Sequence, residues 1–172
     1  MRMITAIAVV LLAAGLAQAE MQTTTFTDTP NLVIPDSPGG AGTLVTSTMD
    51  IALDHYISDI RVYIAVDIDE WSSDLRIWVT SAWQTQVELF FIAEGGEPAT
   101  DPAGWYPTDF TPHEDMTVWH GEGGGGTWTI AGQDWSQGGG DSVITEWRVE
   151  ITYDDAVANE ATTFGALKAL FD

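Results

Sequence analysis

A strict alternation of apolar and polar side chains is the feature that most limits how this chain can fold. Between Ser58 and Asp69 every second residue is a branched aliphatic one, with polar residues such as Arg61 and Asp67 between them. The aliphatic residues are Ile60, Val62, Ile64, Val66 and Ile68. A period of two places successive side chains on opposite faces of a strand, whereas a helix repeats every ~3.6 residues. The stretch is therefore predicted to be a β-strand with one buried face.

The same alternation recurs along the chain and predicts an all-β protein. It is found at Leu75-Ile77-Val79, at Val87-Leu89-Phe91 and from Val143 to Tyr153. Clusters of Gly, Pro, Ser and Asp separate these segments, and the residues from Gly95 to Glu114 form one long connection without a recognisable motif. Strands at this spacing, without convincing helices between them, are typical of stacked antiparallel sheets.

Residues 32–154 are predicted to form this domain, an antiparallel β-sandwich of jelly-roll type. Trp128 and Ile130 share one face of a strand, and Val143 and Trp147 share one face of another. Large apolar side chains on a common face suit packing into a core. We expect these four residues to point inward.

The first nineteen residues have the composition of a secretory signal peptide. Arg2 precedes an apolar run from Ile4 to Leu16, and Ala17-Gln18-Ala19 supplies a small-x-small cleavage pattern. The run is short for a membrane span, and no second candidate follows. We expect the mature chain to begin at Glu20 and to be periplasmic, extracellular or on the cell surface, without membrane insertion after cleavage. The alternative is an uncleaved membrane anchor.

Two further segments flank the predicted domain. Residues 20–31 are rich in Thr and are interpreted as a leader or an edge strand. Residues 155–172 form a tail in which Phe164, Leu167 and Leu170 recur at helical spacing. The tail is predicted to form a short helix that docks on the sandwich, and the alternative is a helix that binds a partner.

The charge balance excludes some partners and favours others. The whole chain has 5 Lys and Arg against 26 Asp and Glu, and loss of Arg2 with the signal leaves 4 against 26, a formal charge of −22. Such a surface repels nucleic acids and anionic lipids, and attracts cations. There are no cysteines, so disulfides cannot staple the domain.

Five aspartates are candidate calcium ligands. Asp67 and Asp69 lie on one face of a predicted strand, Asp74 follows in the next turn, and Asp134 and Asp141 flank a Gly-rich turn. Calcium takes six to eight oxygen ligands and accepts them from loops. Clustered carboxylates without a cation would repel one another. The alternative is that Asp74 and Asp141 cap turns through their side chains.

Enzymatic motifs are few in the sequence. It has no G-x-S-x-G, no cysteine nucleophile and three histidines, His55, His113 and His120. His113-Glu114 resembles the start of a zinc-protease helix, but Thr117 stands where the second histidine is needed. A zinc site shared by His113 and His120 is an alternative to two surface histidines, and no catalytic residue is predicted.

Tryptophans near turns raise the alternative of a glycan-binding protein. Trp71, Trp83, Trp105 and Trp135 lie beside turns and are expected to be exposed. A flat indole can stack on a sugar face, although loop tryptophans also cover the ends of sandwiches. A lectin-like jelly roll is thus the second candidate function.

Three stretches, in their order along the chain, resemble a known family. They are IPDSPGG at Ile34–Gly40, DIRVYIAVDI at Asp59–Ile68 continuing into SSDLRIWV at Ser72–Val79, and GTWTI followed by Asp134 and later by WRVEI at Trp147–Ile151. Together they resemble the P domain, or Homo B domain, of subtilisin-like proprotein convertases such as furin and kexin. The resemblance extends from about Leu32 to Asp154.

The resemblance implies a jelly-roll sandwich that has no catalytic residues and stabilises a serine endopeptidase involved in proteolysis, tuning its response to calcium and acidity. Two stretches depart from the family pattern. Asp69 and Glu70 stand near positions where the family has His and Thr, and Ser81–Thr85 replaces a Ser-Pro-x-Gly-Thr turn. We expect a stand-alone, exported, bacterial version that associates with a separately encoded protease or a cell-surface assembly.

Overall fold

The computed structural model describes residues 20–68, 75–91, 102–135 and 137–155. The predicted signal peptide and the predicted C-terminal helix lie outside these ranges. Within them no helix is long and apolar enough to cross a membrane.

The described residues form nine strands and one short 3-10 helix. The strands are β1 (Met21–Asp28), β2 (Leu32–Ile34), β3 (Val45–Ile51), β4 (Asp59–Asp67), β5 (Leu75–Thr80), β6 (Gln86–Phe91), β7 (Ala103–Tyr106), β8 (Gly126–Asp134) and β9 (Ser142–Asp154). The 3-10 helix η1 spans Met116–Trp119. The prediction of an all-β protein is confirmed.

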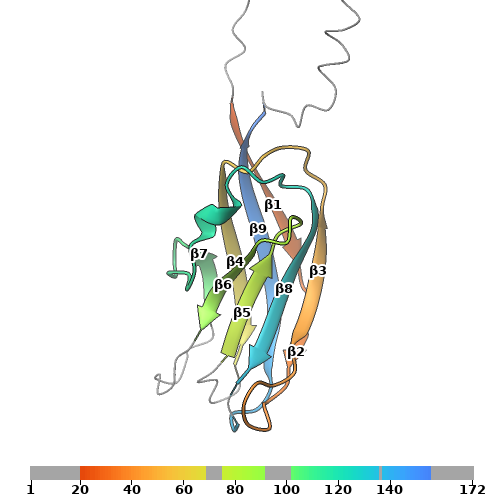
Figure 1. Ribbon diagram of the computed structural model, residues 1–172, viewed down its shortest axis with the longest axis vertical. Helices are drawn as coiled ribbons and strands as arrows, with labels where there is room; N and C mark the ends of the chain where they lie inside the picture. The colour runs from red at the N-terminus through yellow and green to blue at the C-terminus, as the bar shows by residue number, and fades with distance from the viewer. Residues whose placement is uncertain (1–19, 69–74, 92–101, 136, 156–172) are drawn as a thin grey trace, which may run out of the picture.

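Two antiparallel sheets face each other as a sandwich (Figure 1). One has the order β1-β9-β4-β7, with the short β2 also paired to β9, and the other has the order β3-β8-β5-β6. Rolling up one long antiparallel hairpin produces a specific set of strand pairs, and this sandwich has that set: β1·β9, β3·β8, β4·β7 and β5·β6. This is the jelly-roll topology predicted from the strand pattern.

The core lies between the sheets and follows the alternation in the sequence. On β4, Ile60, Val62, Ile64 and Val66 are buried, and Arg61 and Tyr63 point away from the core. Leu75, Ile77 and Val79 of β5 are completely buried. Burial of a branched aliphatic side chain contributes about 1.5–3 kcal/mol, so these two strands supply much of the stability of the sandwich.

Three indoles are completely buried in the core, and each has a partner for its N–H. Trp119 and Trp128 meet edge to face with centroids 5.5 Å apart. Their Nε1 atoms donate to the backbone oxygens of Thr85 and Gly124 at 2.9 and 3.0 Å, and Trp147 Nε1 donates to Asp28 Oδ2 at 3.2 Å. The inward orientation predicted for Trp128 and Trp147 is confirmed, and the pairing with acceptors removes the penalty of a buried polar group.

Strand β9 departs from strict alternation, and one core prediction is wrong. Ile64 pairs with Trp147 and Ala65 with Glu146, but the next residue, Val66, pairs with Ile144, so Thr145 is an extra residue in a β-bulge. A bulge shifts the side-chain parity of a strand. Ile144 is therefore completely buried, and Val143, predicted to point inward with Trp147, is only half-buried.

The ends of β6 and the long connection also differ from the expectation. A register shift in the β5·β6 pair leaves Val87 and Leu89 buried while Phe91 is exposed. The connection predicted from Gly95 to Glu114 contains β7, which pairs with β4 at the sheet edge. Within residues 20–31, interpreted as a leader or an edge strand, Met21–Asp28 forms β1 at the opposite edge of the same sheet.

Candidate functional site

Strand pairing brings the described calcium candidates to one end of the sandwich. Asp67 is the exposed last residue of β4 and pairs with Val143. Asp134 is the buried last residue of β8 and pairs with Leu75, and Asp141 immediately precedes β9. Asp69 and Asp74 lie outside the described residues. Among residues 20–68, 75–91, 102–135 and 137–155, no group of three or more metal-ligating side chains is found.

Asp141 and Asp36 fasten two loops at this end. Asp141 Oδ1 accepts the backbone N–H of Asp36 at 3.0 Å, and Asp36 Oδ1 accepts the N–H of Gly138 at 3.1 Å. Nearby, Gly42 N–H donates to the backbone oxygen of Asp134 at 2.7 Å. Side-chain acceptors of this kind stabilise turns. For Asp141 the geometry matches the turn-capping alternative raised from the sequence.

His113 and His120, the alternative zinc ligands, face different carboxylates. His113 Nε2 lies 3.8 Å from Glu88 Oε2, and its ring packs on Phe91 at 5.4 Å. His120 Nε2 lies 3.7 Å from Asp59 Oδ1. Zinc requires its ligands to converge on one point at about 2 Å, and the described residues around these histidines do not provide such a point.

The tryptophans proposed as a glycan platform do not share one surface. Trp105 lies on the outer face of the sheet that contains β4, where it contacts the ring of Tyr63 at 5.4 Å. Trp83 follows β5 and Trp135 follows β8, and because these strands are antiparallel the two indoles lie at opposite ends of the other sheet. Trp71 lies outside the described residues. A single stacking platform cannot be built from the three described indoles.

Sequence reasoning missed a recurring arrangement around the arginines. Arg61 donates to Glu150 at 2.8 Å and lies over the ring of Trp105 at 5.1 Å. Arg148 donates to Glu146 at 2.8 Å and lies over the ring of Tyr63 at 4.6 Å. These contacts form a polar and aromatic ladder on the outer face of one sheet. The sequence feature that could have predicted these contacts is the small number of arginines in an acidic chain, because each arginine is surrounded by many carboxylates.

Arg76 repeats the arrangement on the other sheet, in a more buried setting. Its Nε and Nη2 atoms donate to the two oxygens of Glu88 at 2.5 and 2.8 Å, and Glu88 is only 4% exposed. The guanidinium also lies over the rings of Trp78, Phe91 and Trp135, at 5.0, 4.9 and 5.3 Å. The hydrogen bond with Glu88 raises the pKa of Arg76, partly offset by desolvation. A bidentate pair of this kind is among the stronger charged interactions in proteins.

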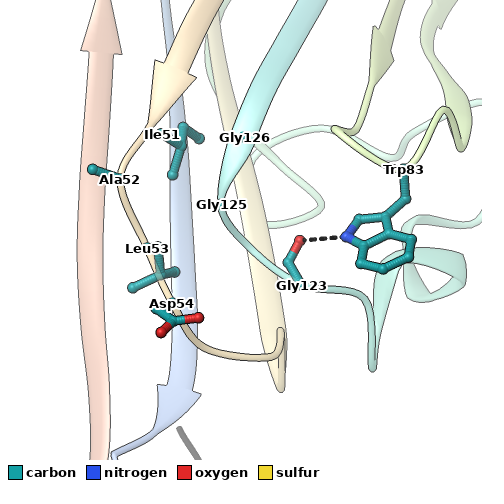
Figure 2. Close-up of a pocket in the computed structure, with 8 residues that line it drawn as sticks. All are labelled: Ile51, Ala52, Leu53, Asp54, Trp83, Gly123, Gly125 and Gly126. Atoms are coloured by element: carbon teal, nitrogen blue, oxygen red, sulfur yellow. Dashed lines mark hydrogen bonds between the residues drawn. The ribbon is translucent and has the colours of Figure 1, made fainter. Parts of the chain in front are cut away.

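A hollow of about 480 Å³ opens at the end of the sandwich opposite to the aspartates. We call it the Trp83 hollow, and it is lined by Ile51, Ala52, Leu53, Asp54, Trp83, Gly123, Gly125 and Gly126. Figure 2 shows Trp83 on one side of the hollow, Leu53 and Asp54 on the other, and the glycine backbone between them. Trp83 is 63% exposed, yet its Nε1 donates to the backbone oxygen of Gly123 at 3.2 Å. The indole is therefore held in place with much of its surface open.

Glycines form the floor of the Trp83 hollow because side chains do not fit there. A Cβ atom on Gly125 would lie 2.2 Å from the backbone oxygen of Leu53, and one on Gly123 would lie 3.1 Å from Trp83 Nε1. Gly126 also has a φ of +118°, which favours glycine. The glycines thus allow the start of β8 to lie close to the residues that follow β3.

The arrangement needed for nucleophilic hydrolysis is not found among the described residues. His113 and His120 face carboxylates, and Nδ1 of His55 has no hydrogen-bond partner while its ring packs against Tyr153 at 4.5 Å. A serine or threonine nucleophile needs a base within hydrogen-bonding reach.

Comparison with known proteins adds information about the fold. No protein-family model matches the chain, and no curated protein matches it. Among solved structures, a serine protease of Aeromonas sobria is similar to it, both in complex with the chaperone (TM-score 0.55, 14% identity, 79% of this chain) and on its own (TM-score 0.54, 13% identity, 78% of this chain). In both cases the match spans 27% of the solved chain. At these identities the similarity establishes a shared fold: the sandwich of this chain has the architecture of a region of a serine protease.

Proposed function

We propose that this chain is an exported, non-catalytic module similar to the P domain, which binds a protein partner. The observation that carries the proposal is the fold shared with a region of a serine protease, over about four-fifths of this chain. The P-domain-like stretches support it, because most of them lie on β4, β5, β8 and β9, the central strands of both sheets, and Ile34–Gly40 runs from the end of β2 into the following loop. In proteins of the P-domain type, the corresponding module stabilises a protease without contributing to its chemistry.

The partner that we propose is a separately encoded serine protease or a cell-surface protein. The fold similarity covers 27% of the protease chain, and we propose that the partner supplies the catalytic part of such an assembly. The acidic exterior, with 26 acidic against 5 basic residues in the full chain, favours a partner with a basic contact surface. Calcium would stabilise the module at the end that contains Asp67 and Asp134.

Capture of the partner and an activity assay test this function together. A tagged full chain, produced in its native cells and crosslinked before lysis, is expected to retain an exported protease or surface protein as the main product. The purified chain alone is expected to leave casein and fluorogenic peptides intact. Hydrolysis that copurifies with the chain and is abolished by one His or carboxylate substitution would overturn the proposal.

Glycan binding is the second candidate, and the exposure of Trp83 favours it. Because Trp83, Trp105 and Trp135 lie on separate surfaces, binding would rely on one indole at a time. A glycan array with the wild-type chain and with Trp83→Ala tests it. Saturable binding that disappears in Trp83→Ala would support a lectin, and an array without binding would leave the protein-binding module.

A further inference from the structure

Every arginine in the described part of the chain is bound in the same way. Arg61, Arg76 and Arg148 each donate to a carboxylate and lie 4.6–5.3 Å from the centroid of at least one aromatic ring. The ring faces attract the cation, and the carboxylate supplies a charged hydrogen bond. All three guanidinium groups therefore have the same surroundings, a carboxylate and an aromatic ring.

The Trp83 hollow has the same two components but no cation. Its lining includes an exposed indole and the carboxylate of Asp54, and it includes no Lys or Arg. Two nearby carboxylates are already engaged, since Asp50 accepts from Thr127 Oγ1 at 2.6 Å and Glu122 accepts from Ser81 Oγ at 2.6 Å. Asp54 makes no hydrogen bond or ion pair with any described residue.

The hollow is preorganised for an incoming side chain. Two hydrogen bonds hold Trp83, one from its Nε1 to Gly123 and one from its backbone N–H to Ser81 Oγ at 3.2 Å. The floor cannot shift freely, because Gly124 N–H donates to the backbone oxygen of His55 at 2.8 Å. A ligand would thus lose little binding free energy to ordering of the site.

The chemistry of the lining favours a cation over a sugar. A sugar needs several convergent hydrogen-bonding groups, but the backbone oxygens of Gly123 and Gly124 already accept from Trp83 and Trp128. The side chains of the lining add an exposed aromatic surface and one negative charge. A guanidinium stacks on an indole and is more weakly hydrated than an ammonium, so arginine fits better than lysine.

We propose that the Trp83 hollow binds an arginine side chain of a protein partner, between the indole of Trp83 and the carboxylate of Asp54. The inference rests on the proposed function, because the arginine belongs to the partner. It adds the contact by which a basic partner is recognised, at the end of the sandwich opposite to the candidate calcium ligands.

A titration with small probes tests the site without the partner. The probes are Nα-acetyl-arginine amide and its neutral isostere Nα-acetyl-citrulline amide, and the readout is the indole N–H signal of Trp83 in the nitrogen-15 NMR spectrum of the full chain, assigned by its loss in Trp83→Ala. We expect the arginine probe to shift this signal saturably and the citrulline probe to bind at least about fivefold more weakly. Asp54→Asn is expected to raise the dissociation constant two- to fivefold, as for an exposed charge pair of about 0.4–1 kcal/mol.

Matched variants and a sugar panel separate the possible outcomes. Trp135→Ala removes an exposed indole at the other end of the sheet and is expected to leave the arginine titration unchanged. Equal binding of both probes, equal shifts of all indole signals, or saturation of the Trp83 signal by N-acetylglucosamine, galactose or mannose in place of arginine would each overturn the inference. Melting curves of Trp83→Ala and Asp54→Asn check that both variants are folded.

Partner capture distinguishes failure of the inference from failure of the proposed function. If Trp83→Ala and Asp54→Asn capture the partner as well as the wild type does, the partner-binding function stands and the inference is overturned. If the partner is lost in both variants and retained in Trp135→Ala, both stand. If no partner is captured by the wild type, the proposed function fails, and with it the assignment of the arginine to a partner.

Discussion

At the residue scale, Gly125 illustrates how one missing side chain shapes the end of the sandwich. A Cβ atom there would lie 2.2 Å from the backbone oxygen of Leu53, which cannot rotate away as a side chain could. Gly125→Ala is therefore expected to reduce the free energy of unfolding by about 3 kcal/mol or more, the upper range for overpacking. Urea unfolding measures the change.

Gly138 provides the matched control for that substitution. It has a φ of +98°, but a Cβ atom there would meet nothing within 4 Å, so Gly138→Ala has only the cost of a left-handed backbone, about 1–2 kcal/mol. The decisive result is which of the two variants has the lower free energy of unfolding, and we expect it to be Gly125→Ala. Gly125→Ala that is as stable as Gly138→Ala would mean that the chain after β3 does not pack against the glycine run.

Tyr106 gives the protein a defined response to alkaline pH. Burial raises the pKa of its phenol above the ordinary value of about 10. Because the pKa is higher in the folded state, the buried, protonated phenol adds to the free energy of unfolding. This contribution is fully present below the pKa of tyrosine in the unfolded chain and is lost as the pH rises toward the folded pKa. The free energy of unfolding is expected to fall above about pH 10, by at most about 1.4 kcal/mol per pH unit.

The variant Tyr106→Phe tests this assignment, because it removes the titrating group while keeping the ring. Unfolding in urea between pH 8 and pH 11 is expected to show a decline in the wild type and a much flatter profile in Tyr106→Phe. Tyr56→Phe serves as control, since Tyr56 is exposed. If Tyr106→Phe declines as steeply as Tyr56→Phe, another group is responsible.

At the element scale, the bulge at Thr145 decides which side chains of β9 enter the core. Ile144 is completely buried and Val143 only half-buried. Ile144→Ala is expected to cost about 2–5 kcal/mol of the free energy of unfolding, through lost burial and the cavity left behind. Val143→Ala is expected to cost about 1 kcal/mol or less. The reverse order, measured by urea unfolding, would place Val143 in the core as the uninterrupted alternation predicts.

The strands with a clear alternation were predictable from the sequence, and their irregularities were not. Alternation identified β4, β5, β6 and β9 because burial of one face leaves a period-two trace. A bulge adds one residue without any change in composition, so the parity of Val143 and Ile144 was misassigned. Strand β7 has only four residues, next to Pro102 and Pro107, which is too short for an alternation to be recognised.

The candidate site was less predictable than the fold. The exposure of Trp83 followed from its place beside a turn, but Asp54 lies 29 residues away in sequence, and only the jelly-roll topology places it across the hollow from Trp83. The pair of Arg61 with Glu150 was missed for the same reason, because the two residues are 89 residues apart in sequence. Contacts between distant strands leave no periodic signal in the chain.

At the scale of the whole molecule, the acidic charge sets the dependence of stability on cations. The 26 acidic side chains are balanced by few basic ones, and the described arginines are each already paired. Repulsion among the remaining carboxylates destabilises the compact state and is relieved by screening or by bound ions. Screening and specific binding make different predictions for calcium.

Specific binding predicts that calcium raises the melting temperature of the chain more than magnesium does. With a dissociation constant of about 0.1–1 mM, typical of extracellular modules, calcium at about 10 mM would add about 1.4–2.7 kcal/mol, or about 3–10 °C. A chelator would reverse the effect. Asp67→Asn combined with Asp74→Asn is expected to remove it, whereas Asp54→Asn at the opposite end retains it. The opposite outcome is that calcium and magnesium, at the same ionic strength, raise the melting temperature equally in the wild type and in the double variant. That result would mean that the ions only screen the acidic surface.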